Sequence, residues 1–333
     1  MFMRAGQFET AGQLARDDVP VTIAVLLPCY NEGLVIATVI DRFRAMLPDA
    51  KIYVYDNNSR DNSAEIARRA GAIVRSEPRQ GKGFVVRRMF ADIDADIYIM
   101  CDADETYDAE AAPDLIRQLV DGGFDMVVGT RVDTSGTAYR PAHRFGNWML
   151  TSLVRAIFGG GFSDMLSGYR AFSKRFVKSF PQMSQGFEIE TELTIHALQL
   201  EMPTSEAPTR FKDRVEGSES KLQTVTDGFR ILWTIATLLK QERPFALFGS
   251  ISLFLLSLAL LFGYPVIAEY MHSYTVPRLP MALLATGTMI LAFLSLFCGL
   301  ILDTVTRGRK EAKLLRYLQL PSVYARLETQ DMV

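Results

Sequence analysis

Two long apolar tracts near the C-terminus place the strongest constraint on how this chain folds. Residues 245–268 and 279–302 carry no charged side chain, and each exceeds the roughly 20 residues needed to cross a ~30 Å hydrocarbon core. Residues 269–278 join them as a short loop. The sequence therefore predicts a transmembrane hairpin of two helices, with a hairpin buried in a soluble protein as the alternative.

Basic residues flank the hairpin on one side of the expected membrane. Lys240 and Arg243 precede the first tract, and the loop carries only Arg278. The residues that follow the second tract include Arg307, Arg309, Lys310, Lys313 and Arg316. Because basic flanks stay in the cytoplasm, we expect a multi-pass membrane protein with its large domain on the cytoplasmic face, at the inner membrane if the chain is bacterial.

Length and composition suggest one large domain with an appendage. The chain has 333 residues, more than most single domains, and its net charge of -2 gives no nucleic-acid signal. The polar N-terminus lacks the apolar core of a signal peptide. The expected parts are a flexible arm at residues 1–20, a cytoplasmic domain at 21–243, the hairpin at 244–303 and a basic cytoplasmic tail at 304–333.

Short apolar runs alternate with helical patterns through the large domain. The runs predicted as strands are residues 21–27, 51–55, 72–75, 97–101 and 124–128. This alternation predicts an α/β fold with a doubly wound, mostly parallel sheet. Nearly every run ends in polar or glycine-rich residues, which we expect to converge along one rim.

One predicted strand ends in two carboxylates. Asp102, Ala103 and Asp104 directly follow the apolar residues 97–101. If strand geometry continues through them, Asp102 and Asp104 point the same way, because side chains alternate with period two. Paired hard oxygen ligands suit Mg²⁺ or Mn²⁺ carrying substrate phosphates. A solvated acidic turn before the next helix is the alternative.

Residues 145–158 form an apolar helical pattern with aromatic side chains and a basic flank. Such a helix belongs either in the core or on a membrane surface, and the sequence leaves both open.

In this order, the motifs resemble those of the inverting family-2 glycosyltransferases of the dolichyl-phosphate mannose synthase and bacterial polyisoprenyl-phosphate glycosyltransferase group. The resemblance runs from residue 21 to about residue 239, and the hairpin matches the longer members. It rests on Pro-Cys-Tyr-Asn-Glu at 28–32, Asp-Asn-Asn-Ser-Arg-Asp at 56–61, Gly-Lys-Gly at 81–83, Asp-Ala-Asp at 102–104, Gly-Thr-Arg at 129–131, Ser-Gly-Tyr-Arg at 167–170 and the segment 214–222.

The resemblance implies a GT-A fold of the nucleotide-diphospho-sugar transferase type, and a role for each motif residue. Asp104 and Arg131 would be catalytic, and Asp102 and Asp104 would hold Mg²⁺ or Mn²⁺. The nucleotide-sugar donor would contact Pro28, Tyr30, Glu32, Asp56, Lys82, Asp102 and Ala103. The acceptor phosphate would meet Ser167, Arg170, Arg214, Ser218, Ser220 and Lys221. A homo-oligomer, dimer or tetramer, is also implied.

Two departures from the group leave the donor open. Glu105-Thr106-Tyr107 replaces the usual Leu-Gln after the acidic pair, and Asn57 stands where a second Asp is common. Several residues also have structural alternatives. Lys82 could lie in a plain turn and Arg131 in a surface ion pair, and Glu188 and Glu190 could form a solvated first helical turn.

The implied reaction moves a hexose from a UDP-glucose or GDP-mannose type of donor to a polyprenyl or dolichyl phosphate, with inversion. An acceptor phosphate is already anionic and needs little general base, so positioning by Arg, Lys and Ser matters more. The alternatives are a polysaccharide synthase, a transferase acting on a non-lipid hydroxyl, and a catalytically silent membrane scaffold.

Overall fold

The computed structural model describes residues 21–133, 141–181, 183–186, 188–212, 232–233, 235–237 and 239–323, with the backbone alone at 133 and 141–146. The chain forms two compact units. The first comprises the residues up to Leu232 and those from Lys313 onward, and the second comprises Trp233–Ala312. The expected N-terminal arm, residues 1–20, lies outside the described residues.

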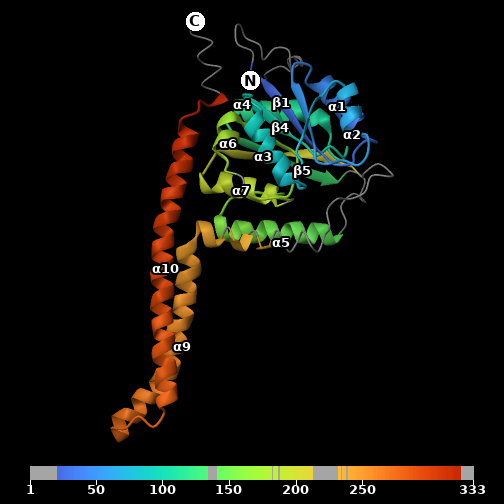
Figure 1. The fold of residues 1–333 in the computed structure, drawn as a ribbon. Coiled ribbons are helices and arrows are strands. Elements are labelled where there is room, and N and C mark those ends of the chain that lie inside the picture. Colours follow the sequence, from blue (N-terminus) through green and yellow to red (C-terminus); the bar gives the residue numbers. More distant parts are fainter. Residues whose placement is uncertain are drawn as a thin grey trace, which may run out of the picture. The chain divides into compact units, whose positions relative to one another are not determined.

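A sheet forms the centre of the first unit (Figure 1). It has seven strands in the order β3-β2-β1-β4-β6-β5-β7. The strands are β1 (Ile23–Cys29), β2 (Lys51–Asp56), β3 (Ile73–Ser76), β4 (Ile97–Met100), β5 (Met126–Asp133), β6 (Arg170–Ser173) and β7 (Thr204–Phe211). Only β6 runs antiparallel to its neighbours, β4 and β5. The predicted doubly wound, mostly parallel α/β fold is confirmed.

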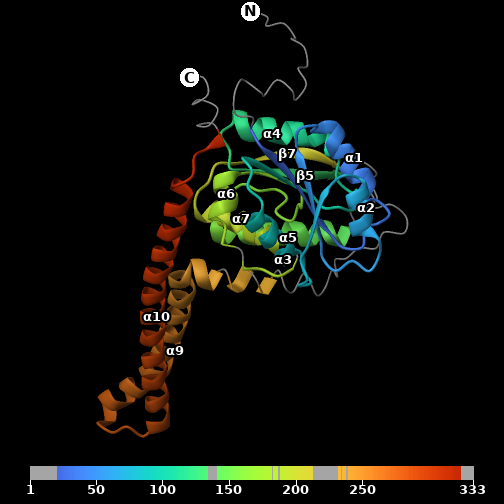
Figure 2. The ribbon, with the colours of Figure 1, turned by 45° about the horizontal axis from the view of Figure 1, so that its top comes forward.

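Helices cover both faces of this sheet (Figure 2). One face packs against α1 (Ile36–Met46), α2 (Ser63–Arg69) and α4 (Ala112–Asp121), which follows a short 3-10 helix at Ala109–Ala111. The other face packs against α3 (Lys82–Asp92), α6 (Lys174–Ser179) and α7 (Ile189–Gln199). Alternate side chains of β1 enter the two cores, since Val25 and Leu27 lie in one and Ala24 and Leu26 in the other.

The sequence did not predict β6 and β7. β6 has four residues and begins with an arginine, Arg170, so it lacks the apolar run that indicates a buried strand. β7 is an edge strand with mostly half-buried polar residues and contains Pro208. Proline is tolerated at an edge because no neighbour needs its missing N–H.

Helix α5 (Pro141–Phe158) covers the range where the sequence left two environments open. Leu150 and Val154 are buried, whereas Trp148, Met149 and Leu153 are exposed. One side of the helix therefore belongs to the core. Contact of the exposed side with a membrane stays a prediction.

The segment from Lys313 onward contributes to the first unit. The Tyr317 hydroxyl donates a 2.7 Å hydrogen bond to the fully buried carboxylate of Asp125. Arg175 also pairs with Asp125 and lies over the Tyr317 ring, 4.7 Å from its centre. Val323 is buried in the core beside α4. These residues fall within the stretch expected to be a separate tail.

The second unit is a pair of long apolar helices, α9 (Pro244–Ser273) and α10 (Leu279–Leu318), whose last six residues belong to the first unit. In the most apolar 18-residue stretch of each helix, only 6% of α9 and 22% of α10 is buried. A core helix of a soluble protein would be mostly buried. Ser252 Oγ donates to Ala292 O (2.8 Å) and Ser295 Oγ to Phe248 O (2.9 Å). Both helices are long and apolar enough to cross a membrane.

Asn57 ties together the loops that follow β2 and β3. Its Nδ2 donates to the carbonyls of Glu77 (2.9 Å) and Arg79 (2.7 Å), and its Oδ1 accepts from the Gly81 N–H (2.7 Å). The side chain is 4% exposed. An amide supplies both the donor and the acceptor that these bonds need, whereas an aspartate supplies only acceptors.

We expect Asn57→Asp to destabilise the first unit. The new carboxylate would face two carbonyl oxygens in a buried position, which costs about 2 kcal/mol and lowers the Tm by roughly 4–8 °C. Circular dichroism melts of the purified full chain in detergent measure this. Asn62→Asp is the matched control, because Asn62 is exposed before α2 and Asp suits that position equally well. Equal melting of Asn57→Asp and wild type would contradict this role of the amide.

Candidate active site

Loops from several strands meet at the carboxyl edge of the sheet between β1 and β4. The strand order reverses there, since β2 lies on one side of β1 and β4 on the other, and open α/β sheets bind ligands at such a point. Antiparallel β6 begins at Arg170, which pairs with Met100 at the end of β4. The residues before Arg170 are therefore brought to the acidic pair that follows β4.

The acidic pair has one buried and one accessible carboxylate. β4 ends at Met100, so the alternation expected from a continuing strand does not apply to Asp102 and Asp104. Asp104 is 5% exposed, and its Oδ1 accepts hydrogen bonds from Thr106 Oγ1 (2.6 Å) and N (3.3 Å). The Asp102 side chain keeps 31% exposure and is paired with Lys82. Asp104 is thus held in place, while Asp102 is accessible.

These two carboxylates fit a divalent cation that arrives with a nucleotide. In the part of the chain that the structure describes, no group of three or more His, Cys, Asp or Glu side chains is arranged to hold a metal. Mg²⁺ usually keeps several waters and is bound through one or two carboxylates plus substrate phosphates. Two hard oxygen donors at the end of a strand match that chemistry.

Lys82 lies between two carboxylates from distant parts of the chain. It begins α3, and its Nζ donates to Asp102 Oδ1 and to Glu190 Oε1 in the first turn of α7. The side chains of Lys82 and Glu190 are 8% and 5% exposed. Burial acts to lower the pKa of Lys82, but the two carboxylates outweigh it and raise that pKa above its ordinary value. Lys82 is therefore a charged group in this site.

Two glycines allow the backbone to approach the site closely. Gly81 has a φ of +138°, and a Cβ there would lie 2.2 Å from the Gln185 carbonyl oxygen. A Cβ at Gly168 would lie 2.5 Å from Asp102 Oδ2. A side chain at either position would displace its neighbours, so Gly-Lys-Gly is not a plain turn here.

The expected nucleoside side of the site holds a buried oxygen without a partner. Asp56 ends β2, and its Oδ1 makes no hydrogen bond to any described residue. The adjacent loop after β1 is fixed by Asn31 Oδ1, which accepts from the Arg60 N–H (2.7 Å), and by the Glu32 N–H, which donates to Ser63 Oγ (2.8 Å). An unsatisfied buried acceptor beside a fixed loop suits a ligand that donates hydrogen bonds.

The remaining residues expected at the donor are at or near the end of β1 and β4. Pro28 lies within β1, and Tyr30 follows it and is partly exposed. Glu32 is 7% exposed. Ala103 is buried in the core beside α1 and α4, so only its backbone is available to a donor.

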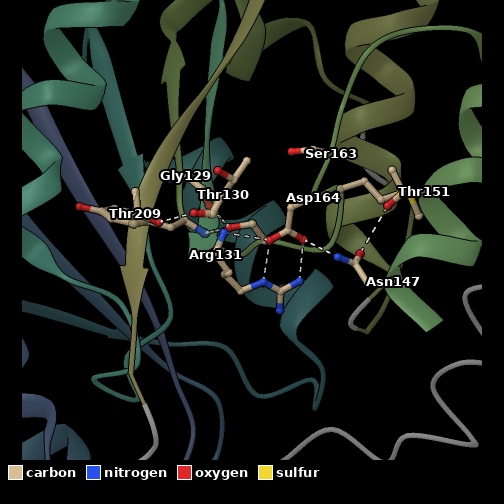
Figure 3. Close-up of polar contacts among 12 residues, drawn as sticks. Gly129, Thr130, Arg131, Asn147, Thr151, Ser163, Asp164 and Thr209 are labelled. Atoms are coloured by element: carbon tan, nitrogen blue, oxygen red, sulfur yellow. Dashed lines mark hydrogen bonds and ion pairs between the residues drawn. The ribbon is translucent and has the colours of Figure 1, made fainter. Parts of the chain in front are cut away.

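Arg131 is held by a hydrogen-bonded chain that reaches α5 (Figure 3). Its Nε and Nη2 donate to the two oxygens of Asp164 at 2.8 and 2.6 Å. Asn147 Nδ2 donates to the same carboxylate (2.9 Å), and Thr151 Oγ1 donates to Asn147 Oδ1 (3.4 Å). Burial alone would raise the pKa of Asp164, but Arg131 outweighs it and lowers that pKa. Since the Arg131 and Asp164 side chains are 15% and 9% exposed, this is not a solvated surface pair.

Ser167 and Arg170 make hydrogen bonds to neighbouring parts of the fold. Ser167 is fully buried, and its Oγ donates to the Gly129 carbonyl. Arg170 is also fully buried and donates to the carbonyls of Ser167 (2.9 Å) and Met165 and to Thr194 Oγ1 (3.0 Å). Burial lowers the pKa of Arg170 to about 10, so it stays charged at neutral pH. Both residues support the loop before β6, and the acceptor role expected for them stays a prediction.

The other expected acceptor residues, Arg214, Ser218, Ser220 and Lys221, lie outside the described residues. Glu188, left open by the sequence, accepts hydrogen bonds from the N–H groups of Gln185 (3.2 Å) and Gly186 (3.1 Å). It therefore fixes the loop before α7.

The structure brings two further carboxylates to the site: Glu190, whose role was left open from the sequence and which is not solvated, and Asp164, for which no role was predicted. Glu190 pairs with Lys82 across 108 positions of sequence, and Asp164 pairs with Arg131 across 33. Neither partner is visible in a local pattern. Lys82 and Arg131, however, were recognised from the sequence. A buried basic side chain needs a carboxylate partner, and that requirement is the signal that points to Glu190 and Asp164.

Known proteins are similar to this chain in sequence and in fold. The model of glycosyl transferase family 2 matches residues 24–180. Glycosyltransferase AglJ of Haloferax volcanii is 32% identical over 280 residues, which are 82% of this chain and 92% of that protein. The dolichyl-phosphate hexose transferase of the same organism is 26% identical over 221 residues, 66% of this chain and 95% of that protein.

A solved structure is also similar, that of glucosyl-3-phosphoglycerate synthase from Mycobacterium tuberculosis in complex with Mn²⁺, UDP-glucose and phosphoglyceric acid. It is 26% identical with a TM-score of 0.52 and covers 66% of this chain and 79% of that chain. The resemblance inferred from the motifs is confirmed by these matches. The chain is a GT-A-like enzyme that belongs to glycosyl transferase family 2.

Proposed function

We propose that this protein transfers a hexose from a nucleotide-diphosphate sugar to a polyprenyl phosphate at a membrane, with inversion and with a divalent cation. The observation that carries the proposal is the union of two parts in one chain. A family-2 catalytic domain with an acidic pair at the end of β4 is followed by two apolar helices whose side chains are largely exposed.

The donor would bind across the carboxyl edge between β2 and β4. Asp56, with its unpartnered Oδ1, would meet the nucleoside together with Pro28, Tyr30 and Glu32. Asp102 and Asp104 would hold Mg²⁺ or Mn²⁺. The similar solved structure, a glucosyl-3-phosphoglycerate synthase, contains Mn²⁺ with UDP-glucose, which supports a donor and metal of this class.

Bond breaking at the anomeric carbon leaves extra negative charge on a departing diphosphate. A bound divalent cation supplies Lewis-acid stabilisation of that charge. Lys82 adds a positive charge, and because its side chain is only 8% exposed, that charge acts more strongly than it would in solution. Asp104 is kept in one orientation by Thr106, so little reorganisation is needed during the reaction.

The acceptor would be an anion rather than a neutral hydroxyl. Arg131 would add positive charge beside it, with its guanidinium oriented by the bonds from Nε and Nη2 to Asp164. A phosphate oxygen is deprotonated at neutral pH and needs no strong general base. An acceptor with a long isoprenoid tail would lie in the bilayer, which explains why the chain carries two apolar helices. One relative is named a dolichyl-phosphate hexose transferase.

The basic residues that flank α9 and follow the apolar part of α10 support a cytoplasmic catalytic domain. Lys240 and Arg243 precede the hairpin, and the loop between its helices carries Arg278 paired with Glu269 at 3.1 Å. Because more basic residues flank the hairpin than lie in this loop, the positive-inside rule predicts that the loop is on the non-cytoplasmic side of the membrane.

Asp104→Asn should lower turnover by about a thousandfold or more, because loss of one metal ligand removes several kcal/mol of charge stabilisation. Initial rates with saturating donor in membranes measure this. Asp108→Asn is the matched control, since Asp108 is a buried carboxylate nearby that accepts from the Glu110 N–H, and its rate should stay within about twofold of wild type. A wild-type rate for Asp104→Asn would overturn the metal assignment.

A panel of radiolabelled UDP- and GDP-hexoses identifies donor and acceptor class together. Membranes containing the protein, Mg²⁺ or Mn²⁺ and added polyprenyl phosphate should yield label that extracts into organic solvent, and a chelator should abolish it. Membranes containing Asp104→Asn are the background control. Label found only in water-soluble products would reject the lipid acceptor and favour a soluble one, such as the phosphoglyceric acid present in the similar structure.

A further inference from the structure

The two ion pairs of Lys82 are unequal. The Glu190 side chain is 5% exposed, whereas that of Asp102 is 31% exposed. A buried carboxylate that loses its cation is strongly destabilised, while a partly exposed one can recruit water or another cation. Lys82 can therefore leave Asp102 far more easily than it can leave Glu190.

The backbone also ties Lys82 to the element that carries Glu190. The Gly83 N–H donates to the Gln185 carbonyl (3.0 Å), in the loop before α7. A Cβ at Gly83 would lie 2.5 Å from the Ser184 carbonyl oxygen. This direct backbone contact fixes the start of α3 against the segment that leads into Glu190, so the Lys82–Glu190 pair is built into the fold.

We propose that Glu190 is a positioning residue that holds Lys82 as an exchangeable counter-cation of Asp102. Without a donor, Lys82 balances the charge of Asp102 and competes with a free divalent cation for that carboxylate. When the metal and nucleotide bind together, Lys82 breaks its ion pair with Asp102. It stays paired with Glu190 and contacts the negatively charged phosphates of the nucleotide. The inference rests on the proposed role of Asp102 as a metal ligand.

This arrangement couples metal binding to nucleotide binding. While Lys82 occupies Asp102, only a fraction of the molecules is competent for free metal, and the apparent affinity falls by that fraction. A nucleoside diphosphate offers Lys82 another anionic partner, so Lys82 no longer competes with the metal for Asp102. The site would thus discriminate against a metal ion that arrives without substrate.

Mn²⁺ binding to the purified full chain in detergent, followed by electron paramagnetic resonance, tests this without any turnover. Lys82→Met should bind free Mn²⁺ at least about tenfold more tightly than wild type, since a competing charge is gone. UDP should then strengthen Mn²⁺ binding less in the variant than in wild type, and hexose transfer should fall. A merely structural lysine would produce no gain in metal affinity.

Further variants separate the possible outcomes. Glu190→Gln should weaken free Mn²⁺ binding severalfold relative to wild type, because Lys82 then has Asp102 as its only carboxylate. Lys82→Arg keeps the charge and should show no gain. Lys174→Met, which removes a lysine paired with the exposed Asp94, should behave as wild type. Melting curves confirm that each variant is folded.

If folded Lys82→Met binds free Mn²⁺ no better than wild type, while wild type binds Mn²⁺ with UDP, the counter-cation role is wrong and the metal assignment stands. If wild type binds no Mn²⁺ with either UDP or GDP, the metal assignment itself fails and the inference fails with it.

Discussion

Lys82 joins three elements that are distant in the chain: the start of α3, the loop after β4 and the first turn of α7. A charged amine that is 8% exposed is tolerated only with carboxylate partners close by. Much of the surrounding backbone serves this contact. Asn57 fixes the loop before Lys82, and glycines remove side chains where backbones meet. Asp102 of the acidic pair is therefore part of a charge network even without a ligand, in which one lysine faces two carboxylates.

Strands β1, β2 and β4 follow from the sequence because each contains a run of apolar residues, whereas β5 (Met126–Asp133) continues through polar residues beyond the predicted end at 128. β1, β2 and β4 were predicted to within two residues at either end, since a strand buried on both faces has little choice of composition. β6 could not be predicted in the same way. Its Arg170 is buried through bonds to carbonyls supplied by other segments, and such compensation is visible only after folding.

The residues of the site likewise fall into those that the sequence predicted and those that only the fold reveals. Asp102, Asp104, Lys82 and Arg131 were recognisable because each lies in a short motif after a predicted strand, although β5 in fact continues through Arg131. Their partners were not, because Glu190 and Asp164 reach them through the tertiary fold. Asn57 shows the reverse case. The sequence presents it as a departure from a common Asp, yet its amide makes three hydrogen bonds that an Asp could not all supply.

The order of the chain limits how the catalytic unit can be separated from the apolar helices. The first unit resumes at Lys313, after the hairpin. Tyr317 then donates to Asp125, a fully buried carboxylate that otherwise relies on Arg175 and Ser173. Val323 fills part of the core beside α4. A chain cut before α9 would therefore lose packing from its catalytic unit, and any loss of activity in such a fragment would not by itself report on the membrane.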